Sequence, residues 1–397
     1  MKKLIKVMDI LFVCGIVGFM LFGLCKAYLA PIEENAYENR TAVKMPLPGI
    51  GSFLDGSFQS GVEDALSDQA VGAIPMKELY NTLSGKIQLM GVDILTGIGG
   101  EGQYIGFNSL IYNDGYLLEP MVPLEDVQDG LDGSLDALIS SLEGVDVPVY
   151  AYYVGRDMDH DFYLGDTSGV YEYISRRLED SGLFDGIDAF HVEDIEEYKE
   201  YFFMTDHHYN HLGAHRAYTQ VLGMLLPHET PIPTGDAVEL EYAYNGSRSR
   251  TAGALGLVNE RVSVYDYDLP EVRVTVNHGE PTDRYGNRHR YLSGVSEAES
   301  VEYAHIYGYD SGRILFENGE VVNGEHLLIL GDSYDNAYLW QLSAHFETVH
   351  AVDLRNYESG MGEAFYLSDY VEENGITRVI FAGRNEFYYD TLSVLEG

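Results

Sequence analysis

After about residue 128, the sequence alternates between short apolar runs and longer amphipathic stretches. The run 147–154 (VPVYAYYV) has the length and the β-branched and aromatic content of a buried strand. Strands that alternate with helices form βαβ units, so the sequence predicts an α/β domain with a parallel sheet sandwiched by helices. The other predicted strands are 189–192, 327–330, 349–354 and 379–382, and the predicted helices are 131–142, 170–183, 210–226, 335–346 and 363–373.

Two regions do not follow this alternation. From 231 to about 323 the pattern changes to short runs such as VELEYAY, RVSVYDY and EVRVTV, separated by turn residues. These runs are typical of strands, so we predict a β-rich insertion at 231–323. Residues 31 to about 60 are rich in Gly, Pro and Asn, and helical stretches follow. We expect a stem and N-terminal extension over 31–120, followed by the α/β domain over 121–397.

The N-terminus has the composition of a membrane anchor. Three lysines precede an apolar run over 10–25, and Lys26 follows it. With the preceding Val7 and Met8, the run approaches the about 20 residues that span a bilayer. Lysines before a span stay inside the cell, so the chain after residue 30 is expected outside it. A cleaved signal peptide is the alternative, but 27–30 (AYLA) is a poor cleavage site. We therefore favour a single-pass anchor at the cell membrane over 1–30.

Composition excludes one class of partner and one class of site. The chain has 24 basic and 64 acidic residues, and 24 − 64 gives a formal charge of −40. Such a field repels polyphosphate, so a nucleic-acid partner is excluded. The two cysteines, Cys14 and Cys25, both lie in the N-terminal apolar run. The exported part therefore has neither a disulfide nor a thiolate metal site.

Polar residues follow the predicted strands directly. In a parallel sheet the functional site lies beyond the carboxyl ends of the strands, so these residues are expected to meet at one edge. The segments concerned are Gly155-Arg156-Asp157, Gly331-Asp332-Ser333, Gly383-Arg384-Asn385-Glu386 and, before the third predicted helix of the domain, Thr205-Asp206-His207-His208-Tyr209. A serine, two histidines, an aspartate and amide donors are thus available to one site.

Ser333 stands where a nucleophile is exposed at the rim of such a sheet. Gly331 permits a tight turn after the strand, and the start of a following helix favours an oxyanion nearby. The Ser333 backbone and the Asn385 side-chain amide are the candidate donors to that oxyanion. Each short motif also has a purely structural interpretation, because Asp332 and Ser333 can cap a helix and 383–386 can be a polar turn.

A nucleophilic serine needs a base, and the base needs a carboxylate that fixes its tautomer. In an extended segment, residues two apart share a side, so Asp206 can reach the ring of His208. His207 is the other candidate base, because spacing alone does not exclude it. Alternatively, Asp206 or Asn210 simply caps the helix that follows.

The segment 201–210 (YFFMTDHHYN), followed by Gly213-Ala214, resembles the signature of the bacterial DHHW protein family. That family is similar to SGNH-hydrolase-like proteins of the alginate O-acetyltransferase type. Nearly the whole chain after the anchor fits the resemblance, except the β-rich insertion. The other segments that carry it are 38–40 (ENR), 53–56 (FLDG), 68–69 (DQ), 152–157 (YYVGRD) and 352–355 (VDLR).

The resemblance implies an SGNH-like (flavodoxin-like) fold in which the Asp-x-His motif precedes the serine. It makes Ser333 the nucleophile, His208 the base, Asp206 its orienting carboxylate and Asn385 the oxyanion amide. The sequence departs from the family pattern at Tyr209, where Trp is expected, and at Glu386, where Asp is expected. Arg156 and Arg384 are further polar candidates at the strand ends.

The resemblance also implies transfer or removal of an acyl group, in the first place acetyl, on a cell-surface polysaccharide. No cofactor or metal is expected, and a membrane-bound O-acyltransferase is the implied acyl donor. One alternative is a catalytically silent carbohydrate-binding or scaffold protein of the same fold. Another is a metal-dependent hydrolase, because His211 and His215 are four residues apart on a predicted helix and lie close in sequence to His207 and His208.

Overall fold

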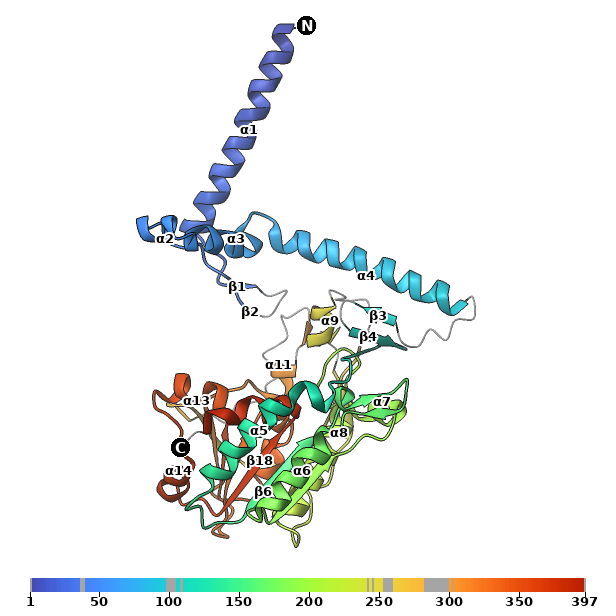
Figure 1. Cartoon of the computed structure of the whole chain (residues 1–397), viewed down its shortest axis with the longest axis vertical. Coiled ribbons are helices and arrows are strands. Elements are labelled where there is room, and N and C mark those ends of the chain that lie inside the picture. The colour runs from blue at the N-terminus through green and yellow to red at the C-terminus, as the bar shows by residue number, and fades with distance from the viewer. Residues whose placement is uncertain are drawn as a thin grey trace. The chain divides into compact units, whose positions relative to one another are not determined.

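A computed structural model describes residues 2–35, 40–97, 105–107, 110–240, 243–244, 246–252, 260–281, 300–301 and 303–395 (Figure 1). The chain divides into two compact units, which we treat separately. The N-terminal unit comprises residues 1–95 with 250–257, and the α/β unit comprises residues 96–249 with 258–397.

Helices dominate the described part of the N-terminal unit. Helix α1 (Lys2–Leu29) contains an apolar stretch, Ile10–Leu29, that is long enough to cross a membrane. The predicted extended stem contains helical segments, because α2 and α3 follow a short hairpin. Gln69 ties the hairpin region to α3, since its side chain bonds the backbone of Ile32 and Val43. The elements are β1 (Glu34–Asn35), β2 (Arg40–Thr41), α2 (Ile50–Leu54), α3 (Ser57–Gln69) and α4 (Ala73–Gly97).

The α/β unit is organised around a mostly parallel sheet, as the strand–helix alternation predicts. Its strand order is β13-β15-β17-β16-β18-β6-β9. Five strands are parallel: β6 (Val149–Val154), β9 (Gly186–Phe190), β16 (His326–Gly331), β17 (Thr348–Val352) and β18 (Arg378–Gly383). Two strands from the region 231–323, β13 (Arg273–Val276) and β15 (Arg313–Glu317), extend the sheet in antiparallel fashion.

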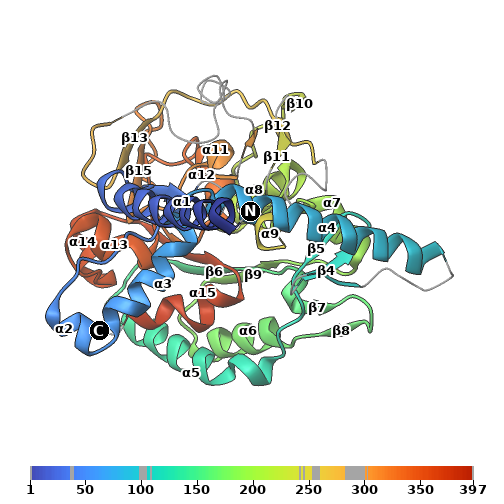
Figure 2. The same ribbon diagram turned by 90° about the horizontal axis from the view of Figure 1, so that it is seen from above.

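Helices cover both faces of this sheet (Figure 2). One face packs against α5 (Leu124–Ser141), α6 (Val170–Ser181), α13 (Leu354–Met361), α14 (Leu367–Glu373) and α15 (Asn385–Tyr389). The other packs against α8 (His211–Leu225) and α12 (Leu339–Leu342). The single helix predicted over 335–346 is wrong, because Tyr338 leaves helical geometry and splits it into a 3-10 turn, η2 (Asp335–Ala337), and α12.

The remaining elements of the α/β unit are short and lie in the connections. Their strands are β3 (Ile105–Phe107), β4 (Leu110–Asn113), β5 (Tyr116–Leu118), β7 (His160–Asp161), β8 (Asp166–Thr167), β10 (Ala237–Glu239), β11 (Ala243–Tyr244), β12 (Ser263–Tyr265) and β14 (Ser300–Val301). Their helices are η1 (Asp157–Asp159), α7 (Ile195–Tyr201), α9 (Ser247–Thr251), α11 (Tyr303–Tyr307) and η3 (Thr391–Leu395). Helix α9 ends across the boundary between the two units.

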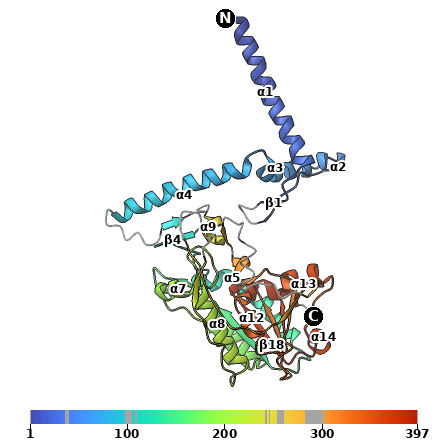
Figure 3. The same cartoon turned by 180° about the vertical axis from the view of Figure 1, so that it is seen from behind.

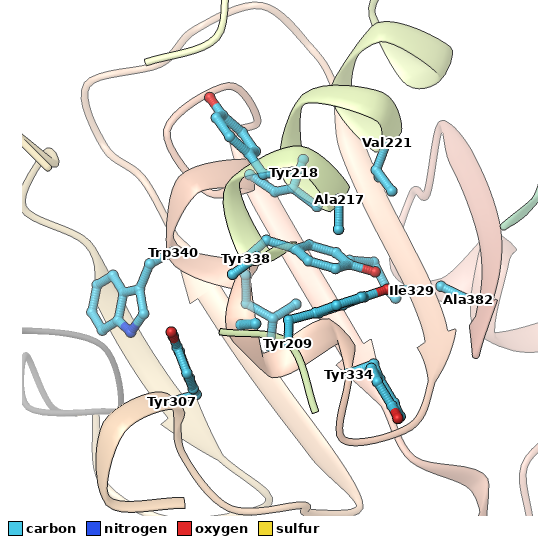
Figure 4. Packing of buried hydrophobic residues seen from close by; sticks show 14 of the residues in the cluster. Tyr209, Ala217, Tyr218, Val221, Tyr307, Ile329, Tyr334, Tyr338, Trp340 and Ala382 are labelled. Carbon is cyan, nitrogen blue, oxygen red and sulfur yellow. The ribbon is translucent and has the colours of Figure 1, made fainter. Parts of the chain in front are cut away.

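Buried tyrosines fill the layer between α8 and the sheet. Figure 4 shows Tyr209 and Tyr338 between Ala217 of α8 and Ile329 of β16. Tyr209, at the position where the family pattern has Trp, is fully buried and packs against Tyr334 with ring centroids 5.1 Å apart. A large flat ring at position 209 therefore serves core packing directly behind the sheet edge that carries Ser333.

Gly331 ends β16 where there is no room for a side chain. A Cβ atom there would lie 2.8 Å from the Ala382 carbonyl oxygen and would also clash with the Asp335 carboxylate. We expect Gly331→Ala to lower the free energy of unfolding by about 1–3 kcal/mol, because the clash involves backbone. Denaturant unfolding measures this, with Gly319→Ala as the control, since a Cβ there meets nothing within 4 Å. Equal stabilities of the two variants would contradict the close packing of this turn.

Candidate active site

The turn after β16 presents Ser333 at the carboxyl edge of the sheet. The Asp332 carboxylate fixes this turn, because one oxygen accepts the Tyr334 N–H at 3.1 Å and the other accepts the Arg384 N–H at 3.2 Å. Arg384 follows β18, which lies beside β16 in the sheet. Asp332 therefore joins the two neighbouring loops that carry the predicted nucleophile and the predicted oxyanion amide.

The Asp-x-His segment is a tight loop and not the extended segment that the sequence predicts. An isolated bridge between Phe202 and Tyr209 closes the loop at its base. The Asn210 side chain then caps α8 by accepting the N–H groups of Leu212 and Gly213. The cap of α8 is thus Asn210 and not Asp206, whose carboxylate accepts hydrogen bonds from His208 and Ser247 instead.

The structure brings Ser333, His208 and Asp206 into one chain of hydrogen bonds. The Ser333 Oγ lies 2.6 Å from His208 Nε2, and His208 Nδ1 lies 2.6 Å from Asp206 Oδ1. The same Asp206 oxygen also accepts the His208 backbone N–H at 3.1 Å. This is the geometry by which a carboxylate fixes an imidazole tautomer while the other ring nitrogen accepts a serine proton.

The second oxygen of Asp206 accepts the Ser247 N–H at 2.7 Å. Burial alone would raise the pKa of Asp206, but the rings of His208 and His207 and the Ser247 N–H hold that pKa well below its usual value. Asp206 is therefore ionised under ordinary conditions, as an orienting carboxylate must be.

His207 lies beside the triad but bonds elsewhere. Its Nδ1 lies 2.8 Å from Ser247 Oγ, and its ring lies against the His208 ring with centroids 3.9 Å apart. Burial and the neighbouring His208 lower the pKa of His207 well below its usual value, although Asp206 opposes this shift. His207 thus lies beside the pair Asp206–His208, and among the described residues no hydrogen bond joins it to Ser333.

Tyr303 is a site residue that the sequence did not reveal. Its ring stacks on His208 with centroids 3.6 Å apart and an interplanar angle of 9°, and its hydroxyl donates to the Ser333 carbonyl at 2.8 Å. The stacked ring limits rotation of the imidazole. Tyr303 lies in the region 231–323, where no motif distinguishes it from the other tyrosines.

Asn385 carries a buried side-chain amide whose donor group is not used within the described part of the chain. Its side chain is 0% exposed, and its Nδ2 has no hydrogen-bond partner among the described residues. The amide oxygen accepts the Glu386 N–H at 3.0 Å. A buried amide group without a partner is costly, and a developing oxyanion is a ligand that would satisfy it.

A buried network of charges underlies these loops. Arg156 pairs with Glu119 at 2.5 Å and with Glu386 at 3.0 Å, and Arg248 pairs with Glu119 and Asp157, each at 2.7 Å. Arg156 is 0% exposed, and its two terminal nitrogens face the carboxylates of Glu119 and Glu386. By contrast Arg384, which lies 3.2 Å from Glu386, keeps part of its side chain exposed at the rim.

Glu260, also from the region 231–323, clamps the residues that precede Asp206. Its carboxylate accepts the backbone N–H groups of Met204 and Thr205 at 2.7 and 2.9 Å, and the Thr205 hydroxyl at 2.5 Å. Burial raises the pKa of Glu260 to about 7, although these three donors lower it. The loop that carries the predicted base is therefore held from outside by a group that titrates near neutral pH.

The four histidines of the metal alternative do not gather at one point. His215 Nδ1 lies 2.8 Å from the Tyr267 hydroxyl, and the His211 ring packs on Tyr265. Within the described residues, the group of possible metal ligands is Asp206, His207 and His208, whose ligand atoms lie within 4.8 Å of one another. Both His208 nitrogens of that group are already hydrogen-bonded, to Asp206 and Ser333.

Comparisons with known proteins place the fold. No protein-family model matches the sequence, and a search of curated proteins gave no match. A DHHW family protein from Eubacterium siraeum has a TM-score of 0.54 at 17% identity, over 73% of this chain and 96% of that one. The chain shares its fold with a DHHW family protein, which confirms the resemblance at that level.

Two further solved structures are similar. Bacillus cereus PatB1, in a structure with a sulfonyl adduct, has a TM-score of 0.53 at 17% identity, over 72% of this chain and 98% of PatB1. The O-acetyltransferase domain of Pseudomonas putida AlgJ has a TM-score of 0.39 at 11% identity, over 72% of this chain and 91% of that domain.

The Glu260 clamp predicts a pH-dependent stability. The native state raises the Glu260 pKa from 4.5 to about 7, so it holds the proton more tightly than the unfolded chain does. The contribution of Glu260 to the free energy of unfolding should therefore be greatest below pH 4.5 and fall by roughly 1–3 kcal/mol as the pH rises to 7. Glu260→Gln should lack this component. Denaturant unfolding from pH 4.5 to 8 tests the difference between the two proteins, and parallel pH profiles would contradict it.

Proposed function

We propose that this chain is an extracytoplasmic SGNH-type enzyme that transfers or removes an acyl group through Ser333. The observation that carries the proposal is the continuous hydrogen-bond chain from Ser333 through His208 to Asp206. The unpartnered amide of Asn385, at the end of the neighbouring strand, supports it. Acetyl is the acyl group that the family resemblance favours, and cell-surface polysaccharide is the substrate class.

In the first half-reaction, Ser333 Oγ attacks the acyl carbonyl carbon while His208 Nε2 takes the hydroxyl proton. Asp206 stabilises the imidazolium that forms, and the Asn385 amide and the Ser333 N–H donate hydrogen bonds to the carbonyl oxygen as it gains negative charge. The bond to the leaving oxygen then breaks, and His208 returns the proton to that oxygen. The acyl group remains on Ser333 as an ester.

In the second half-reaction, His208 takes a proton from an acceptor hydroxyl, which attacks the acyl-serine carbonyl. The bond to Ser333 Oγ breaks, and the serine recovers its proton from His208. A sugar hydroxyl as acceptor makes the chain a transferase, whereas water makes it an esterase. Both outcomes use the same residues.

A transferase outside the cell needs an acyl donor there. We propose a membrane-bound O-acyltransferase as that donor, in line with the family resemblance. Helix α1, retained as a single-pass anchor, would raise the effective concentration of Ser333 near the donor. The formal charge of −40 gives the chain no general attraction to anionic lipid, so the anchor supplies this proximity.

Ser333 should be the residue that is acylated. Because a sulfonyl adduct occurs in Bacillus cereus PatB1, a small sulfonyl fluoride is the first reagent to use. We expect one adduct per chain by intact mass, mapped to Ser333, and turnover of p-nitrophenyl acetate that Ser333→Ala abolishes. Ser359→Ala, which removes an exposed hydroxyl of α13, is the matched control.

Equal ester hydrolysis by wild type and Ser333→Ala would refute the proposal. EDTA should change neither the rate nor the melting temperature. A loss that zinc restores would instead favour the ligand group Asp206, His207 and His208.

We expect His208 to act as the base and His207 to take no part in proton transfer. His208→Ala should lower kcat for p-nitrophenyl acetate by about a thousandfold or more, as much as Ser333→Ala, because triad members act as a unit. His207→Ala removes the contact with Ser247 but not the bond to Ser333, so its loss should be far smaller. Steady-state kinetics on folded variants decides, and the opposite ranking would make His207 the base.

A further inference from the structure

A continuous row of exposed apolar side chains runs along α4. Its members recur every three or four residues, so they share one narrow arc of the helix surface. Soluble proteins rarely leave an apolar patch of this length uncovered, so the row implies a partner. We call the row the α4 stripe; it consists of Met76, Leu79, Tyr80, Leu83, Ile87, Met90 and Ile94, which are 53–71% exposed.

The start of α4 is joined to the apolar helix α1. An apolar pocket of about 340 Å³ is lined by α1 residues, among them Phe19 and Leu24, and by Leu66 and Val71 from α3 and the turn that leads into α4. The α1 part of this lining lies within Ile10–Leu29, the stretch long enough to cross a membrane. The turn that leads into α4 thus lies against the exit end of that stretch.

The direction of α4 relative to α1 is that of a helix on the membrane surface. Figures 1 and 3 show α4 running across the direction of α1 instead of alongside it. A helix that starts at the exit end of a span and runs across its axis lies along the membrane surface. The short helix α2, which also lies near this end of α1 in both views, exposes Ile50, Phe53 and Leu54.

We propose that the α4 stripe binds the outer surface of the lipid bilayer, as an interfacial amphipathic helix beside α1. The proposal rests on α1 being retained as an anchor. Helix α4 contains two lysines, Lys77 and Lys86, and two acidic residues, Glu78 and Asp93, so 2 − 2 gives no net charge. Within a chain of charge −40, α4 is thus suited to a bilayer through apolar area and needs no anionic lipid.

The same spacing would also suit a coiled-coil partner such as a second copy of the chain. The junction with α1 and the direction of α4 favour lipid over that partner. Lipid contact along α4 would give the anchor a second point of attachment and fix the orientation of the N-terminal unit on the membrane. A second copy is retained as an outcome of the test.

Tryptophan quenching in vesicles tests the proposal. The chain has one tryptophan, Trp340, which is buried, so Trp340→Phe gives a clean background. A single tryptophan is then placed in the stripe (Ile87→Trp), in the span (Phe19→Trp) or on an exposed loop of the α/β unit (Tyr163→Trp). Each protein is reconstituted in phosphatidylcholine vesicles of three kinds: without bromine, with acyl chains brominated near the headgroup, and with acyl chains brominated near their ends.

We expect bromine near the headgroup to quench the Ile87→Trp protein at least about twofold and bromine near the chain ends to quench the Phe19→Trp protein, while the Tyr163→Trp protein is unaffected by either lipid. Quenching of Phe19→Trp alone, with Ile87→Trp emitting as if in water, would overturn the proposal. Blue-shifted but unquenched Ile87→Trp emission would also overturn it, in favour of a protein partner. Lack of quenching at position 19 would refute the retained span itself. None of these readouts needs catalysis, so they are independent of whether Ser333 is acylated.

Discussion

The candidate site depends on a buried network of charges. Arg156 and Arg248 share Glu119, while Asp157 and Glu386 complete their pairs. Removing one partner from such a network leaves a buried charge uncompensated and costs several kcal/mol, so its members must be positioned together. Glu386 adjoins Asn385, and Arg248 adjoins Ser247, whose N–H holds Asp206. One network therefore adjoins both Asn385 and the loop that carries Asp206 and His208.

The main residues of the candidate site could be predicted because the polar residues that follow parallel strands meet at one edge of the sheet. Strands β16 and β18 are neighbours in register, so Ser333 and Asn385 follow adjacent strand ends even though fifty-two residues separate them (385 − 333). The pairing of Asp206 with His208 could be predicted because the two residues are close in the sequence. Its loop is bent and not extended, but Asp206 reaches the His208 ring in either geometry. The mostly parallel sheet followed from apolar patterning alone.

The supporting residues could not be predicted, because their roles depend on long-range contacts without a local pattern. Tyr303, Ser247 and Glu260 all come from the region 231–323, where turns and short strands carry no motif. The α4 stripe is periodic in the sequence, but periodicity describes a buried face and an exposed face equally well. Only the structure shows that the side chains of the α4 stripe are exposed.

Two acidic residues lie near the turn that carries Ser333: Asp335 is two residues further along the chain, and Asp310 accepts a hydrogen bond from Asn336 at 2.9 Å. Burial and neighbouring carboxylates raise the pKa of Asp335 well above its usual value, and burial also raises that of Asp310, although Arg355 lowers it. A carboxyl group with a raised pKa keeps its proton to higher pH, so burial reduces the negative charge that these two groups place beside the Ser333 turn. The pKa of Asp206 is shifted in the opposite direction, well below its usual value. Negative charge is thus retained at Asp206, where the proposed mechanism needs it to stabilise the imidazolium of His208.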